Sequence, residues 1–163
     1  MKKIAFVGKE QNKIFKAAVL KFISSRGIEY EDVSYDIIHK DVYADYVIVN
    51  SHINTLNSKI NCRYCFINMD SIYQEKISIN GNLITYGFGN KNTITISSVE
   101  NENEGFVYCI QRFLVCSNSN IVEPQEIPIE VAFDTEEQLY SYMVAITISL
   151  IEKVDSKKIF NKE

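Results

Sequence analysis

The sequence at residues 83–100 is LITYGFGNKNTITISSVE, and it joins two halves of the chain that differ in pattern. Before it, short continuous apolar segments alternate with helical or loop segments. After it, apolar and polar residues alternate in strands separated by polar turns. At residues 86–90 (YGFGN), two glycines and an asparagine interrupt the β pattern. Because glycine adopts positive φ without penalty, this segment predicts a turn or a close approach of the backbone.

The first half predicts a parallel α/β sheet. Continuous apolar runs predict buried strands at 3–7, 46–50 and 64–68, and a more polar segment at 29–35 predicts an edge strand. Apolar residues at i, i+3, i+4 and i+7 predict a helix at 13–25. Gly27 follows it as a C-cap.

The second half predicts an antiparallel meander followed by a helix. Its strands are expected at 93–99, 106–114 and 126–131, and two prolines, at 124 and 128, place the last one at an edge or a strand start. Asp134 or Thr135 is expected to cap a helix at 136–153 that is apolar on most faces, and Thr135 with Gln138 matches a capping box. The predicted fold is therefore α/β, a three-layer sheet whose parallel core is extended by the meander, with the final helix packed on it. Residues 1–153 form a single domain, and 154–163 are a polar tail.

Composition limits the classes of function. The chain has 163 residues, 46% of them hydrophobic and 23% charged, which fits one globular domain with an ordinary core. A net charge of -4 without a basic block argues against a nucleic-acid partner. No apolar run reaches membrane-spanning length, and the run that follows the first lysines is too short for a signal peptide. We therefore expect a cytoplasmic protein with no membrane partner and reduced cysteines.

Two motifs resemble the central domain of the Mur ligase family. Ile67-Asn68-Met69-Asp70 resembles the apolar strand that ends in Asn-x-Asp, and residues 83–89 (LITYGFG) resemble the later apolar-Thr-aromatic-Gly run. In that family, a meander and an Ala-rich helix follow in the same order. These enzymes use ATP to join an amino acid to a carboxylate through an acyl phosphate. The resemblance covers residues 1–153 and implies that Asn68 and Asp70 contact an adenine or ribose; turn chemistry at a strand end is the alternative.

The phosphate loop that the resemblance implies is degenerate here. Residues 7–14 are VGKEQNKI, so Gly8 remains, but the second glycine, the lysine and the hydroxyls of the family loop are replaced. Phosphate binding requires those groups. Gly8, Lys9 and Lys13 are candidates for a remnant nucleotide site, although a solvated strand-to-helix loop is the interpretation we favour. We predict that Glu10 or Asn12 caps the helix and fills the former phosphate position.

The metal-binding residues that the resemblance implies are also missing. His52 lacks the family's neighbouring Asp, Lys59 is closer to Asn68 than the family's carbamylated lysine, and Ser141 replaces an Asn. Cys62 and Cys65 have CxxC spacing, but they lead into a strand, whereas a redox CxxC opens a helix. We interpret them as buried structural thiols, with a metal site as the alternative.

The hypothesis from the sequence is a pseudoenzyme: a non-catalytic Mur ligase-like domain that acts as a binding or scaffold module linked to cell-wall or peptide-ligase chemistry. It implies an unidentified protein partner and no cofactor, with residual ATP and Mg²⁺ binding left open. Tyr86 and Phe88 either pack at the rim of the sheet or stack on a base. The alternative function is a nucleotide-binding subunit of an ATP-dependent ligase that needs a partner chain.

Overall fold

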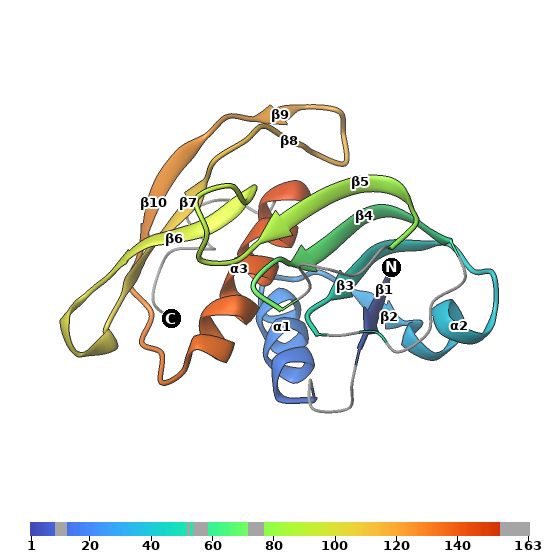
Figure 1. Cartoon of the computed structure of the whole chain (residues 1–163), viewed down its shortest axis with the longest axis horizontal. Helices are drawn as coiled ribbons and strands as arrows, with labels where there is room; N and C mark the ends of the chain where they lie inside the picture. The colour runs from blue at the N-terminus through green and yellow to red at the C-terminus, as the bar shows by residue number, and fades with distance from the viewer. Residues whose placement is uncertain (9–12, 52, 54–58, 72–76, 154–163) are drawn as a thin grey trace.

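The computed structural model describes residues 1–8, 13–51, 53, 59–71 and 77–153 and shows one large mixed sheet with helices packed on it (Figure 1). The elements follow in the order β1 (Lys2–Val7), α1 (Lys13–Ser25), β2 (Tyr30–Asp32), α2 (Ser34–His39), β3 (Ala44–Val49), β4 (Ile60–Asn68), β5 (Ile79–Tyr86), β6 (Ile94–Val99), the 3₁₀ helix η2 (Asn101–Asn103), β7 (Phe106–Ile110), β8 (Leu114–Val115), β9 (Ile121–Val122), β10 (Gln125–Ile129) and α3 (Glu136–Ile151).

The sheet has eight strands in the order β10-β7-β6-β5-β4-β3-β1-β2, and β8 and β9 pair separately. From β2 to β6 neighbouring strands are parallel, and from β6 to β10 they are antiparallel. In the described chain, β5 and β6 are paired only at Tyr86 and Ile94. The segment rich in glycine at 86–90 therefore lies where the parallel and antiparallel halves meet, as the change in sequence pattern predicted.

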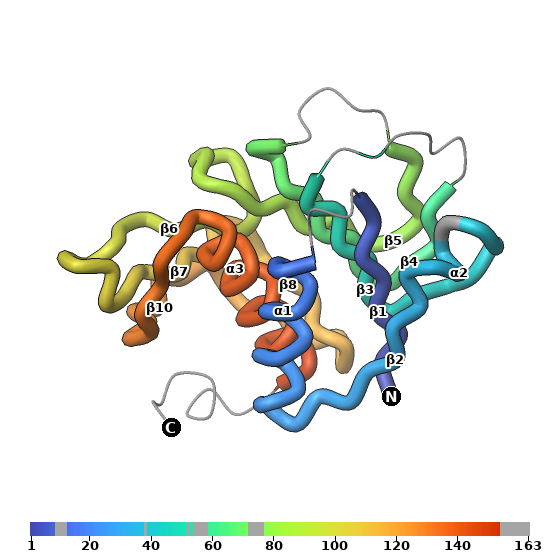
Figure 2. Tube along the Cα trace, turned by 90° about the horizontal axis from the view of Figure 1, so that it is seen from below, coloured from blue at the N-terminus to red at the C-terminus, as the bar shows by residue number. Residues whose placement is uncertain are grey.

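Helices α1 and α3 lie side by side on one face of the sheet (Figure 2). Under them lies the larger core, to which the strands contribute Tyr46, Tyr64, Phe66, Tyr86 and Tyr108. The opposite face carries a second apolar cluster that includes Val47, Val49, Cys65 and Ile67 and is contacted by Ile37 of α2. The α/β class, the parallel sheet with its antiparallel extension and the packing of the final helix are confirmed.

Strand β4 contains a bulge that reverses its alternation. Cys62 faces the second cluster, whereas Tyr64, two residues later, faces α1 and α3. The register against β5 shifts between Asn61 and Tyr64, which is the insertion expected of a bulge. Gly81 lies opposite, and a Cβ there would be 2.2 Å from the Cys62 carbonyl oxygen. The bulge therefore requires glycine on the neighbouring strand and places Cys62 and Cys65 on the same face.

The caps predicted for the two long helices are present. Gly27 has φ 79°, and the Gly27 and Ile28 N–H groups donate to the carbonyls of Ser24 and Ile23. At the start of α3, the Gln138 N–H donates to Thr135 Oγ1 over 3.3 Å, while Gln138 Oε1 accepts from the N–H of residue 134. The capping box is thus present, with its return bond displaced by one residue. Helix α3 ends at Ile151, two residues before the predicted end.

Two predicted strands are wrong in part. The strand expected at 29–35 contains only β2, because Asp32 Oδ1 accepts hydrogen bonds from the Ser34 N–H and hydroxyl and turns the chain into α2. This short helix was not predicted. The strand expected at 106–114 is divided, since β7 ends at Ile110 and β8 belongs to the separate hairpin. In both cases the strand ends where the chain turns away from the sheet, and the pattern of apolar residues does not indicate that point. Strand β10 is at the sheet edge, as its prolines predicted.

Candidate functional site

The carboxyl ends of the parallel strands form the edge of the sheet at which α/β proteins bind ligands. The chain moves from β1 outward to β2 and then returns to place β3 on the other side of β1. This reversal makes the ends of β1 and β3 the topological switch point. Gly8 follows β1 with φ 142°, a conformation that favours glycine, and Asn50 follows β3.

The remnant phosphate loop is only partly within the described chain. Gly8 is exposed at the end of β1, and Lys13 is exposed in the first turn of α1. Lys9, and with it the cap predicted from Glu10 or Asn12, lies outside the described residues. His52 also lies outside them. The structure therefore leaves the predicted Gly8, Lys9 and Lys13 site as a prediction.

A hydrogen-bonded network joins the ends of β3, β4 and β5 to the first turn of α3. Asn50 is at its centre: its Oδ1 accepts from Asn68 Nδ2 over 3.0 Å and from the Tyr86 hydroxyl over 2.6 Å. Asn50 Nδ2 donates to Glu137 Oε1 over 3.0 Å. Both asparagines are buried, and Asn68 and Tyr86 are fully so. The strand ends and α3 are thus held together by a network that is buried at Asn50, Asn68 and Tyr86 and partly buried at Glu137.

Asp70 extends this network to the surface. Its N–H donates to Asn68 Oδ1 over 3.0 Å, an Asx turn that follows directly from the Asn-x-Asp spacing. Asp70 Oδ2 accepts from the Tyr140 hydroxyl over 2.8 Å and from the Phe88 N–H over 2.9 Å. Gly87 has φ 149°, and a Cβ there would be 2.7 Å from Asp70 Oδ1. Glycine is therefore required at the break in the β pattern because the Asp70 carboxylate occupies the space of a side chain.

The two phenols of the network remain protonated at neutral pH. Burial, and after it the charge of Glu137, holds the pKa of Tyr86 well above its usual value. Burial also raises the pKa of Tyr140, and the hydrogen bond to Asp70 raises it further. Both hydroxyls consequently act as hydrogen-bond donors to the network. Neither has the pKa near neutrality that general acid–base catalysis favours.

The hydrogen-bonded network holds the strand ends and the start of α3 in place, but it does not pair a nucleophile with a base. The side-chain amide and carbonyl of Asn68 are bonded within the network, and none of its surface is exposed. Asp70 reaches the surface but is bonded to Tyr140 and Phe88. In the part of the chain that the structure describes, no three His, Cys, Asp or Glu side chains gather in a way that could hold a metal ion.

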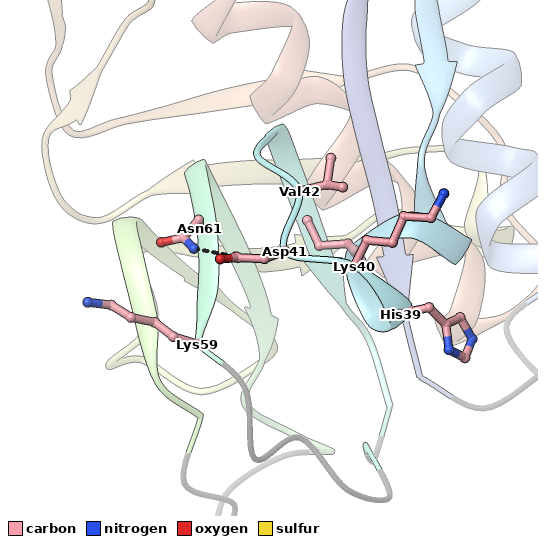
Figure 3. A pocket seen from close by; sticks show the side chains of 7 residues that line it. His39, Lys40, Asp41, Val42, Lys59 and Asn61 are labelled. Atoms are coloured by element: carbon pink, nitrogen blue, oxygen red, sulfur yellow. Dashed lines mark hydrogen bonds between the residues drawn. The ribbon is translucent and has the colours of Figure 1, made fainter.

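A cleft of about 450 Å³ is at the other edge of the sheet, beside α2 and the start of β4. Its side chains diverge: His39 and Lys59 point away from each other, and Asp41 accepts from Asn61 over 3.0 Å (Figure 3). Lys40 forms an ion pair with Asp36 instead. Lys59, considered above as the family's metal-site lysine, precedes β4, whereas Asn68 ends it. This cleft therefore does not bring a set of functional groups together.

The CxxC cysteines are free and buried in the second apolar cluster. A hydrogen bond between the two thiols lowers the pKa of Cys62 and, together with burial, raises that of Cys65. Cys116 is also buried, and Cys109 is half-buried. Within the described chain these environments fit the interpretation of the cysteines as buried structural thiols.

Tyr86 packs under the rim of the sheet, while Phe88 is partly exposed with its ring 5.2 Å from that of Tyr140.

Sequence reasoning identified Asn68 and Asp70 but missed their partners Asn50, Glu137 and Tyr140. The polar residue that ends the strand predicted at 46–50 was a signal for Asn50, because carboxyl ends of parallel strands share an edge. No local pattern connects α3 to that edge.

In comparisons with known proteins, no protein-family model and no curated protein matches this chain. No helix in the described segments is long and apolar enough to cross a membrane.

Proposed function

We propose that this chain is a non-catalytic, Mur ligase-like domain that works as a binding or scaffold module with a protein partner. Its setting would be cell-wall or peptide-ligase chemistry, as the sequence resemblance implies. One observation carries the non-catalytic part of the proposal. At the edge where an α/β sheet binds ligands, the side chains of Asn50, Asn68 and Glu137 bond one another, and the exposed Asp70 carboxylate accepts hydrogen bonds from Tyr140 and Phe88.

A nucleotide at this edge would have to compete with that network. Contact of an adenine or ribose with the Asn68 side chain requires breaking its bond to Asn50 or to the Asp70 N–H. A buried polar group left without its partner costs about 1–3 kcal/mol. Asp70 is more accessible, but its carboxylate anchors Tyr140 and the backbone at Phe88. The retained Asn-x-Asp motif therefore serves the fold in this proposal.

Isothermal titration with ATP and Mg²⁺ tests the proposal. The expected result is no saturable binding up to about 1 mM, a concentration at which a ligand bound with only −4 kcal/mol is half-saturating. Phosphate release is measured in the same samples and should equal that of buffer. Micromolar binding together with hydrolysis refutes the non-catalytic assignment.

The second candidate is a nucleotide-binding subunit of an ATP-dependent ligase that needs a partner chain. It is favoured by Gly8, which follows β1 with positive φ at the switch point and precedes α1. A glycine at this place allows backbone N–H groups to approach a phosphate. If ATP binds, Gly8→Val should abolish binding while urea unfolding confirms a folded protein. Equal binding by Gly8→Val would place the nucleotide elsewhere.

A further inference from the structure

Most of the outer edge of β5 is unpaired in the described chain. One side of the strand pairs with β4 along its length. On the other side, only Tyr86 pairs with β6, and Thr85 Oγ1 accepts from the Thr93 N–H. Residues 79–84 therefore present backbone N–H and C=O groups at every second position without a strand beside them. Such an edge is a template for pairing with another extended chain.

A groove of about 200 Å³ lies beside residues 82–84 of this edge, and residues 112–115, which lead into and include β8 of the β8–β9 hairpin, form its other wall. Exposed apolar side chains and polar ones line the groove together: Leu83 on β5 is 53% exposed, Phe113 and Val115 on the hairpin side are 65% and 47% exposed, and Asn82, Thr93 and Arg112 are among the polar residues beside them. Ile121, which pairs with Val115, is 60% exposed on the hairpin outside the lining of the groove. Apolar side chains on both walls fit the alternating side chains of an inserted strand.

The hairpin wall is fixed in position before anything binds. The Tyr64 hydroxyl donates to the Val115 carbonyl over 2.6 Å, and the Ser117 N–H donates to the Ile151 carbonyl at the end of α3. Leu114, between the exposed residues, is buried in the main core. A preformed groove avoids much of the ordering cost of association.

The charge of the groove indicates what kind of chain it accepts. Arg112 is the charged residue among those that line it, and no carboxylate is among them. The Arg112 guanidinium donates to the Lys91 carbonyl, and this bond holds the positive charge at the groove. The chain as a whole has a net charge of -4. An acidic residue on the incoming strand would complement Arg112.

We propose that the edge of β5 binds an extended peptide segment of a partner protein, in which apolar residues alternate and an Asp or Glu faces Arg112. The segment adds to the sheet beside residues 79–84 and places its apolar side chains against Leu83, Phe113 and Val115. This inference rests on the proposed role as a binding module and names the surface and the partner chemistry. A second copy of this chain fits less well, because its own residues 79–84 are uncharged and would leave Arg112 without an anion.

Fluorescence anisotropy with a designed peptide tests the proposal. The probe is a labelled, capped octapeptide of alternating Val and Thr with one Asp. Two control peptides, called the Lys twin and the proline twin, differ from it at one position: the first has Lys in place of Asp, and the second has a central Pro that removes a ladder hydrogen bond. Both twins should bind about tenfold or more weakly, that is, by about 1.4 kcal/mol. Leu83→Lys should weaken the probe similarly, whereas Val99→Lys, at a strand residue with 51% exposure away from the groove, should not. Arg112→Glu should lose the Asp probe and gain the Lys twin.

The opposite results overturn the proposal. They are no binding of the probe, equal binding of the proline twin, equal weakening by Val99→Lys, or no exchange of preference in Arg112→Glu. Sedimentation of the protein alone should show a monomer in both the parent and Leu83→Lys; a dimer that this variant dissociates would assign the edge to a second copy. The ATP titration is independent of the peptide assay. ATP binding together with hydrolysis would refute the non-catalytic role and leave the groove proposal standing, whereas failure of the peptide to bind would refute the groove proposal and leave the non-catalytic role standing.

Discussion

Replacing Gly87 by Ala tests the fit between this glycine and the Asp70 carboxylate. Two costs are expected. The φ of 149° is a backbone conformation that only glycine adopts easily, which costs about 1–3 kcal/mol for another residue. The new Cβ would also lie 2.7 Å from Asp70 Oδ1 and displace a carboxylate that accepts from Tyr140 and from Phe88. Losing these two partly exposed bonds costs about 0.5–1.5 kcal/mol each.

The sum predicts that Gly87→Ala lowers the free energy of unfolding by about 2–6 kcal/mol. In an Asp70→Ala background the clash is absent, so the same change should cost only the backbone part, about 1–3 kcal/mol. Gly27→Ala is the control, because Gly27 has φ 79° with nothing within 4 Å of the added Cβ. Its cost should be about 1–2 kcal/mol in either background.

Urea unfolding followed by far-UV circular dichroism measures all of these variants, since the chain has no Trp to report by fluorescence. The decisive quantity is the coupling between positions 70 and 87. If Gly87→Ala costs the same with and without the Asp70 carboxylate, the steric account is wrong. A cost no larger than that of Gly27→Ala would also refute it.

Three further changes test the core, the acid response and the thiols. Ile146→Asp should cost several kcal/mol in the same urea assay, because it buries an unpaired carboxylate in α3, whereas Ile14→Asp at a 77% exposed site should cost little; equal melting of both would exclude Ile146 from the core. Burial alone would raise the pKa of Asp32, but hydrogen bonds led by that from Lys16 outweigh it and hold the pKa below 3.8. The ionised carboxylate therefore adds stability above about pH 4 that disappears as pH falls through the lower folded value, and Asp32→Asn should flatten the acid dependence of the unfolding free energy. With native protein, Ellman's reagent should label Cys109 first, since it is only half-buried, and a fast phase that persists in Cys109→Ser would contradict its exposure.

The sequence predicted what depends on periodicity and on local signals. Helix α1 has the predicted bounds, and Gly27 and Thr135 were identified as caps because their chemistry is local. Helix α2 was missed because only six residues form it and the Asp32 side chain starts the turn. For so short an element, a hydrogen bond outweighs any periodic signal.

The candidate site was only half predictable for a different reason. Asn68 and Asp70 belong to one motif and bond each other locally, so their spacing could be recognised. Asn50 and Glu137 are 87 residues apart, and nothing in either neighbourhood indicates that α3 begins over the end of β3. Partners separated by this distance are defined by the topology, which has to be known first.

The final helix has a consequence for how the chain folds during synthesis. Because Tyr86 and Ile94 are the only described ladder pair between the two halves of the sheet, α3, which contacts both β5 and β6 and packs along α1, connects them. A nascent chain that has not yet released α3 from the ribosome would have only α1 on the larger apolar face, and the part of that face under α3 would be uncovered. We therefore expect productive folding to begin only after synthesis of the last helix, with the unfinished chain depending on chaperones until that point.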